Sequence, residues 1–283
     1  MSIFDDWAHH DENEDNIRAG YKHAPTKYCG NKKESLSHIL PHLPQLDTFV
    51  DVFGGSGQVL FSRHRSKLEV YNDRHSGMSA FYRVLQNKEM LADFEQRLDL
   101  LQHSRELFYC FKDEINNVEL DLVERALKWY FMVQVSFGGM GGNFGRVTKP
   151  DTPLFDKIHC YQGDFEHFHK RLQGVQIENL DWKDCINDYD DYTTVFYLDP
   201  PYWNSNQYKH TMSKADHRRM CDMLFDSKGF FALSGYENDV YDQYPWDDIH
   251  IFEVSGNFTP SEHEHKSRAT KHKEFLWIKE SLA

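Results

Sequence analysis

An acid, two prolines and two aromatic rings stand together at residues 199–203, Asp-Pro-Pro-Tyr-Trp, and could do chemistry together. They follow Val195–Leu198, an apolar run that predicts a buried strand. Two successive prolines lack backbone donors and fix φ, so neither a helix nor a central strand continues through them. The sequence therefore predicts a rigid loop with a carboxylate, carbonyls and stacking rings at the carboxyl end of a strand, where open α/β sheets bind ligands. The simpler alternative is a turn in which Asp199 caps a helix.

A glycine-rich turn forms the second candidate site. Thr48–Phe53 predicts a strand that runs into residues 54–57, Gly-Gly-Ser-Gly, and a helix is expected to begin at Gln58. Glycines in such a turn let a ligand approach the helix N-terminus closely. The turn lacks the Lys-Ser/Thr of a P-loop and the six-residue dinucleotide spacing, so it does not require a phosphate ligand.

Two further acids follow predicted strands. Leu68–Tyr71 predicts a strand that ends just before Asp73, and an acid at the tip of the second strand commonly binds a ribose diol. The alternative is that Asp73 caps a helix over residues 76–85. Val175–Asn179 predicts another strand, after which Asp181 and the adjacent indole suit the edge and face of an adenine ring.

The remaining pattern places these sites in an α/β chain with an insertion. Apolar residues recur at three- and four-residue spacing over residues 80–135, which predicts helices, and the strand–helix alternation stops there. The insertion closes in a glycine-rich loop at 136–145. We expect a basic face after it, at Arg146, Lys149, Lys157, Lys170 and Arg171. We also expect helices at 35–43 and 214–225, a helix or turn at 236–244, and strands at 229–234, 250–254 and 274–279.

Bulk composition limits the class of protein. The 283 residues carry a formal net charge of −13, which taken alone argues against a nucleic-acid partner. The charge is uneven, because residues 1–20 hold six acids and one arginine and predict a disordered tail or a loosely docked arm. Five scattered cysteines without a CxxC spacing indicate reduced thiols in a cytoplasm. No apolar run has the length of a membrane span, and no histidine spacing indicates a metal site.

The order of these motifs resembles that of a Dam-like DNA adenine methyltransferase, which methylates the exocyclic N6 amine of adenine. The catalytic stretch of that family is similar to Asp199–Tyr202, and its Phe-x-Gly-x-Gly cofactor loop is similar to Phe53–Gly57. Lys27–Lys32 resembles its N-terminal Lys-x-x-Gly-x-Lys element, and Asp73 and Asp181 stand at its two further cofactor acids. The resemblance covers residues 25–280 and leaves out the acidic tail.

This resemblance implies a Rossmann-like class I methyltransferase sheet of the α/β class, mostly parallel with an antiparallel C-terminal strand, and a mainly helical inserted DNA-recognition domain. We expect the catalytic, cofactor-binding domain at 21–79 and 175–283, the target-recognition insertion at 80–174 and the tail at 1–20. S-adenosylmethionine is the implied cofactor, and double-stranded DNA is the implied partner. We expect a cytoplasmic monomer without a metal, and whether a separate restriction nuclease is a partner stays open.

The implied site residues fall into three groups. In catalysis, Asp199 and the Pro200 carbonyl would accept the two N–H bonds of the amine while Tyr202 stacks on the base. Around the cofactor, the glycine loop would surround the amino-acid part, Asp73 the ribose and Asp181 the adenine amine. The residues are Asp199, Pro200, Pro201 and Tyr202 for catalysis; Tyr28, Cys29, Gly30, Lys32, Asp51, Phe53, Gly55, Ser56, Gly57, Asp73 and Asp181 for the cofactor; and Asn143, Arg146, Lys149 and Arg268 for DNA.

Alternatives of related chemistry stay open. Carbon-5 cytosine methylation needs a cysteine nucleophile, usually after proline, and no Pro-Cys pair occurs in this chain. N4-cytosine transfer typically has Ser in place of Asp199, and RNA or protein amide acceptors use related loops. A catalytically silent cofactor- or DNA-binding module is the non-enzymatic alternative. The insertion loop is also richer in glycine than that of the family, so no target sequence is carried over.

Overall fold

A computed structural model describes residues 24–28, 32–117, 119–148, 154–201, 211–256 and 270–282. Within these ranges seven strands form one sheet in the order β3-β2-β1-β4-β5-β7-β6. The first five strands in this order pair in parallel, whereas β7 runs antiparallel to both β5 and β6. The strands are β1 (Thr48–Asp51), β2 (Leu68–Asn72), β3 (Val175–Glu178), β4 (Thr194–Leu198), β5 (Phe230–Gly235), β6 (Asp248–Gly256) and β7 (Thr270–Lys279). This arrangement confirms the predicted mostly parallel sheet with an antiparallel C-terminal strand.

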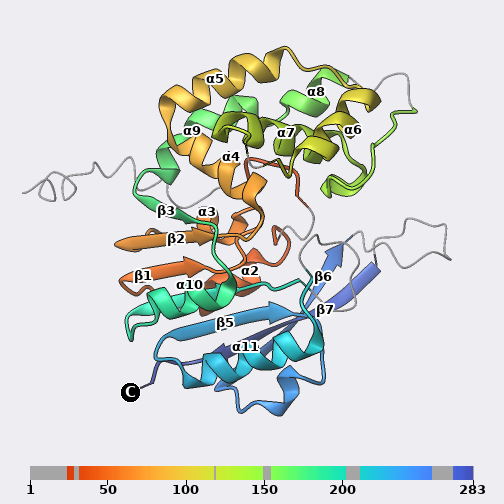
Figure 1. Ribbon diagram of the computed structural model, residues 1–283. Coiled ribbons are helices and arrows are strands. Elements are labelled where there is room, and N and C mark those ends of the chain that lie inside the picture. Colours follow the sequence, from red (N-terminus) through yellow and green to blue (C-terminus); the bar gives the residue numbers. More distant parts are fainter. Residues whose placement is uncertain are drawn as a thin grey trace, which may run out of the picture.

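Alternating side chains of the parallel strands enter two hydrophobic cores, one on each face of the sheet. Val50 and Phe196 belong to the core shared with helices α10 and α11, and Phe49 and Tyr197 belong to the core shared with α2, α3 and α4. Every residue of β4 is buried, as expected for a central parallel strand covered on both faces. Figure 1 shows α10 and α11 on the near side of the sheet. The helices named here are α2 (Leu36–Ile39), α3 (Gln58–Ser62), α4 (Ser76–Gln86), α10 (Trp182–Tyr189) and α11 (Lys214–Asp226).

Helices α4 to α9 form a group that connects β2 to β3 and lies above the sheet in Figure 1. Helix α7 is buried over most of its length, because α4, α5, α6 and α8 all pack against it. Side chains cap the starts of several helices of the group; Asn87, Ser104 and Asp121, for example, each accept a backbone N–H in the first turn. These helices confirm the helical pattern of residues 80–135, while the domain boundaries stay predictions. Besides α4, the group contains α5 (Lys88–Asp99), α6 (Arg105–Glu114), α7 (Leu122–Val135), α8 (Leu154–His159) and α9 (Phe165–Leu172).

A buried ion pair joins this helical group to the sheet. Arg171 of α9 donates to both carboxylate oxygens of Glu69 on β2, at 2.6 and 2.9 Å, and the two side chains are 3% and 2% exposed. The expectation that Arg171 belongs to a basic surface is therefore wrong. Its guanidinium neutralises a buried carboxylate, which would be costly to leave without a partner.

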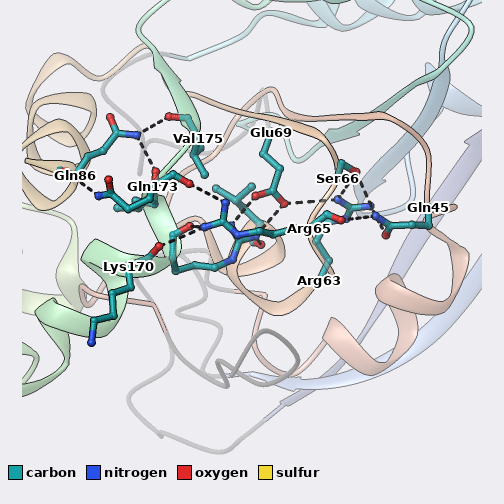
Figure 2. Close-up of polar contacts among 12 residues, drawn as sticks. Gln45, Arg63, Arg65, Ser66, Glu69, Gln86, Lys170, Gln173 and Val175 are labelled. Atoms are coloured by element: carbon teal, nitrogen blue, oxygen red, sulfur yellow. Dashed lines mark hydrogen bonds and ion pairs between the residues drawn. The ribbon is translucent and has the colours of Figure 1, made fainter. Parts of the chain in front are cut away.

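Two further side chains hold the end of α9 to the rest of the molecule by donating to backbone carbonyls (Figure 2). Arg65 donates to carbonyls at the end of α9, and Gln86 of α4 donates to carbonyls on both sides of the turn that leads into β3. We refer to Glu69, Arg171, Arg65 and Gln86 as the polar joint. The acceptors are the carbonyls of Lys170, Arg171 and Gln173 for Arg65, and those of Leu172 and Val175 for Gln86.

Several elements differ in extent from the sequence pattern. The helix expected at 35–43 is a single turn, α2, followed by the 3-10 turn η2 (Leu40–His42), because Pro41 removes a backbone donor there. Residues 236–244 contain only the 3-10 turn η5 (Tyr241–Gln243). Strands β6 and β7 extend beyond the apolar runs, because their polar ends pair with each other. The acidic tail at 1–20 lies outside the described residues, and none of the helices described is long and apolar enough to cross a membrane.

Candidate active site

The glycine loop, residues 54–57, is held in place by side chains from β2 and α4. The Gly55 N–H donates to Asp73 Oδ2 at 3.0 Å, and the Tyr71 hydroxyl donates to the Gly55 carbonyl at 2.7 Å. The Tyr82 hydroxyl donates to the Ser56 carbonyl at 2.6 Å. Both tyrosines are fully buried, so their hydroxyl groups hold the loop carbonyls from fixed positions in the core.

Asn72, the last residue of β2, connects three strand ends. Its side-chain amide donates to the carbonyls of Val52 and Leu180 at 2.9 and 3.3 Å, and its Oδ1 accepts the Leu180 N–H at 2.8 Å. Its own carbonyl accepts the Gly54 N–H at 2.7 Å. A Cβ at Gly54 would lie 2.3 Å from the Tyr71 ring, so only glycine fits where the loop crosses β2.

Asp73 holds the glycine loop by accepting a hydrogen bond from it, and it is not the cap of helix α4. The cap of α4 is His75, whose ring nitrogen accepts the Gly77 N–H at 3.2 Å, so the capping alternative for Asp73 is wrong. Asp73 instead accepts N–H groups from His75 at 2.7 Å and from Gly55. Burial raises the pKa of Asp73 to about 6, although these two N–H donors favour the ionised form.

Three carboxylates from the carboxyl ends of adjacent strands line one pocket. Asp51 ends β1, Asp73 follows β2 and Asp199 follows β4, and all three border the same cavity. Burial, together with the charges of Asp199 and Asp73, raises the pKa of Asp51 well above its ordinary value. Among the described residues Asp51 Oδ1 is buried without a hydrogen-bond partner. A cation in this pocket would relieve both the repulsion and the missing contact.

Lys32 forms an ion pair with Asp199. Its Nζ lies 2.9 Å from Asp199 Oδ1 and 3.0 Å from Oε1 of Glu274 on β7, and all three side chains are largely buried. The Ser234 hydroxyl also donates to Asp199 Oδ1, at 3.2 Å, and the Ser35 hydroxyl donates to Glu274. Burial raises the pKa of Asp199, and the Lys32 ammonium acts against this rise. Lys32, predicted as a cofactor residue, thus lies directly beside the predicted catalytic acid.

The pocket brings together most of the predicted site residues that the structure describes. Gly57 and Pro200 are not among the residues that line it, and Asn143 and Arg146 lie elsewhere. Cys29, Gly30, Tyr202, Lys149 and Arg268 lie outside the described residues. The predicted residues that line the pocket are Tyr28, Lys32, Asp51, Phe53, Gly55, Ser56, Asp73, Asp181, Asp199 and Pro201.

A family model for the D12 class of N6 adenine-specific DNA methyltransferases matches residues 28–234. This match spans the glycine loop, the helical group and the Asp-Pro-Pro-Tyr stretch. The chain belongs to the D12 class.

Three curated relatives of this D12-class chain are methylases or methyltransferases by name. The modification methylase LlaI of Lactococcus lactis is 29% identical over 189 residues, which are 63% of this chain and 29% of that protein. The type II methyltransferase M.MjaIII of Methanocaldococcus jannaschii is 25% identical, over 62% of this chain and 68% of its own length. The DNA adenine methylase of Escherichia coli K12 is 26% identical, over 62% and 63%. The match thus spans less than two thirds of the first and third of these relatives.

In this D12-class chain Asp181, which the sequence predicts to bind the cofactor, already has protein partners. Asp181 caps α10 by accepting the Lys183 N–H at 3.2 Å, and its Oδ2 lies 2.7 Å from Arg74. Arg74 is 61% exposed, so this ion pair is weak and its guanidinium can be displaced at little cost. Trp182 lies beside it with only 7% exposure and lines the pocket.

The glycine-rich loop of this D12-class chain is compact. The Phe137 N–H donates to the Asn143 carbonyl at 2.9 Å, and the Gly141 N–H donates to the Ser136 hydroxyl oxygen at 2.9 Å. These contacts hold Phe137 at the surface with 69% exposure, near Asn143 and Arg146, which are also exposed. In the sequence Phe137 stands within the glycine-rich loop, directly before Gly138 and Gly139, and no pattern there marks its ring as a surface feature.

Sequence analysis also missed the partners of Asp199. Glu274 was assigned only to a strand, and Ser234 only to a buried strand end, because nothing local marks either as a site residue. The role of Asn72 in joining three strand ends depends on the sheet order, which no local pattern shows.

Proposed function

We propose that this chain transfers a methyl group from S-adenosylmethionine to the exocyclic N6 amine of adenine in double-stranded DNA. One observation carries the proposal. Both contacts of the Asp199 carboxylate, from Lys32 and Ser234, go to Oδ1, so within the described part of the chain Oδ2 has no protein partner and is available as an acceptor. The names of the curated relatives, among them a DNA adenine methylase, support the same activity.

The pocket has the charge that S-adenosylmethionine requires. When bound, this cofactor supplies a methyl group activated by a positive sulfonium, and it also carries an ammonium group. Five carboxylates line the pocket, those of Asp51, Asp73, Asp181, Asp199 and Asp216, and among the described residues Asp51 Oδ1 is buried without a hydrogen-bond partner. Asp51 would hold the cationic part of the cofactor, Asp73 its ribose and Asp181 with Trp182 its adenine.

Asp199 and the Pro200 carbonyl would bind the two N–H groups of the target amine. The lone pair of this nitrogen is delocalised into the purine ring, which makes it a poor nucleophile. Two acceptors aimed at the N–H groups favour a pyramidal nitrogen and stabilise the positive charge that develops on it. Lys32 keeps Asp199 ionised and oriented, so the acceptor is in place before the base arrives.

The target adenine must leave the DNA duplex to reach a pocket of this kind. Tyr202 would stack on the extruded base, a contact typically worth about 1–3 kcal/mol. On the DNA side, Asn143 and Arg146 are exposed on the glycine-rich loop, where they would contact the duplex together with Phe137. Lys149 and Arg268 are proposed to contribute phosphate contacts.

A substitution at Asp199 tests this function directly. Asp199→Asn keeps the shape of the side chain and removes its charge, so methyl transfer from labelled S-adenosylmethionine to DNA should fall on the order of 10²–10³-fold. Cofactor affinity, measured by calorimetry, should change far less. Asp239→Asn, which alters an exposed carboxylate paired with Lys214, is the matched control and should leave turnover unchanged. Unchanged turnover in Asp199→Asn would sink the assignment, and parallel assays with RNA and cytosine-only sites would identify another acceptor.

We further propose that the chain acts in the cytoplasm as a monomer, with double-stranded DNA as its macromolecular partner. Single-molecule modification mapping of DNA from cells that express the chain would identify the target sequence. A separate nuclease would be indicated if that sequence is also cut in cells that lack the methylation.

A further inference from the structure

His217 of α11 is a fully buried histidine that touches the catalytic loop. Its Nε2 lies 3.1 Å from the carbonyl oxygen of Pro201, and its Nδ1 lies 2.6 Å from the hydroxyl of Tyr241 in η5. Tyr241 is 2% exposed, and its ring packs edge-on against Trp277 at 4.9 Å between centroids. The histidine therefore links the loop after β4 to η5 directly and, through the Tyr241 ring, to β7.

The acceptor at Pro201 determines which ring nitrogen carries hydrogen. A carbonyl oxygen can only accept, so Nε2 must be protonated to make this contact. In a neutral imidazole Nδ1 is then an acceptor, which the Tyr241 hydroxyl satisfies. Burial lowers the pKa of His217 to about 4, so the ring is neutral near neutral pH. The Pro201 carbonyl thus selects the Nε2–H tautomer, and the Tyr241 hydroxyl holds the ring in place by donating to Nδ1.

The loop needs such a contact because of its own sequence. Pro200 and Pro201 have no N–H groups, so this segment cannot be fixed by backbone donors. Its position depends on the Asp199 side chain, held by Lys32 and Ser234, and on carbonyls that accept from elsewhere. Along the chain, the His217 contact at Pro201 follows Pro200, whereas the contacts of Lys32 and Ser234 at Asp199 precede it. The two anchors therefore flank the carbonyl that would accept the second N–H of the amine.

We propose that His217, oriented by Tyr241, is a positioning residue for methyl transfer that fixes the Pro200 carbonyl and Asp199 relative to the target amine. This role rests on the proposed function. It assigns no proton transfer to His217, which acts only through the loop. A displacement of about 1 Å in a reacting geometry can lower turnover on the order of 10²-fold, so losing the anchor should affect kcat rather than cofactor binding.

Four variants of the full chain test this role. Tyr241→Phe removes one hydroxyl and keeps the ring, while His217→Leu removes the donor to Pro201 and His217→Gln offers an amide donor in its place. Tyr244→Phe is the matched control, because the Tyr244 hydroxyl also joins η5 to α11, through Arg218 and Asp222, without contact to the loop. The measurements are kcat and KM for S-adenosylmethionine and DNA, cofactor affinity by calorimetry, and the melting temperature.

We expect kcat to fall roughly 10-fold in Tyr241→Phe and on the order of 10²-fold in His217→Leu, with partial recovery in His217→Gln. Cofactor affinity should stay within about 3-fold of the parent in each, and Tyr244→Phe should match the parent in kcat. A purely structural role would lower the melting temperatures of Tyr241→Phe and Tyr244→Phe alike and leave kcat per folded molecule unchanged, which would overturn the proposal.

Nitrogen-15 spectra of the imidazole should show the neutral Nε2–H tautomer in the parent, and the Nδ1–H tautomer would likewise overturn it. A parent chain that transfers no methyl group to DNA would overturn the proposed function and this role with it.

Discussion

Replacement of Lys32 by methionine should move the acidic limb of the pH–activity profile to higher pH. Lys32 Nζ is 2.9 Å from Asp199 Oδ1, and an opposite charge at such a distance typically lowers the pKa of a carboxyl group by about 1–3 units. That range corresponds to about 1.4–4 kcal/mol in favour of the ionised form. Burial and the charge of Glu274 already raise the pKa of Asp199, and both effects remain after the lysine is removed. Ionised Asp199 would then be lost as pH falls through a pKa that lies higher than in the parent, because the lysine no longer opposes the effect of burial.

The assay is kcat for labelled methyl transfer at saturating cofactor and DNA, measured from pH 5 to pH 9. Glu274→Gln removes a like charge and should move the limb in the opposite direction, and the double variant Lys32→Met with Glu274→Gln should lie between the two single variants. Lys33→Met removes a neighbouring exposed lysine and is the control for general charge loss. If the limb of Lys32→Met coincides with that of the parent, Lys32 does not set the ionisation of Asp199, and its proposed effect is refuted.

Three further outcomes are expected. The pKa of Asp73 is raised to about 6, so protonation below that pH should remove an acceptor from the cofactor pocket; calorimetry from pH 5 to pH 8 should show weaker S-adenosylmethionine binding at the acidic end, and a flat profile would contradict a ribose contact. Arg171→Met should lower the free energy of unfolding by about 3–5 kcal/mol in urea titrations, because it leaves a buried carboxylate without its main partner. Lys170→Met, on the same helix but exposed, should cost less than about 1 kcal/mol, and equal losses would show that the pair is not stabilising. Phe137→Ala should raise KM for DNA and leave KM for the cofactor unchanged, whereas a change in the cofactor value alone would place the ring outside the DNA surface.

The sheet and the strand ends of the site could be predicted from the sequence for a simple physical reason. The buried parallel strands β1, β2 and β4 are short apolar runs, and their carboxyl ends must meet at one edge of the sheet. Acids placed directly after such runs therefore converge, as Asp73 and Asp199 do. The glycine loop between β1 and α3 could also be predicted, because an apolar strand followed by Gly-Gly-Ser-Gly is typical of a strand–turn–helix unit.

The partners of these acids could not be predicted, because they depend on contacts between distant parts of the chain. Lys32 and Glu274 are 242 positions apart and meet only because β7 inserts beside β5. Arg171 reads as one charge in a basic run, and only the packing of α9 against β2 shows that it is buried with Glu69. His217 lies in an otherwise polar stretch of α11, and its contact with Pro201 follows from the path of the loop rather than from any local pattern.

The polar joint also has a consequence for chimaeric proteins. The chain leaves the sheet after β2 and returns at β3, and Glu69, Arg65 and Gln86 hold the returning segment through Arg171 and through backbone carbonyls. A graft that exchanges only residues 87–172 would replace α9, including Arg171, while Glu69, Arg65 and Gln86 stay in the host chain. Glu69 would then be buried without its arginine. An exchange of the helical group that begins before Arg63 and ends after Val175 would transfer the crossing points together with their charges. The boundary at which this chain can be recombined is thus set by an ion pair inside the catalytic sheet and not by the visible edge of the helical group.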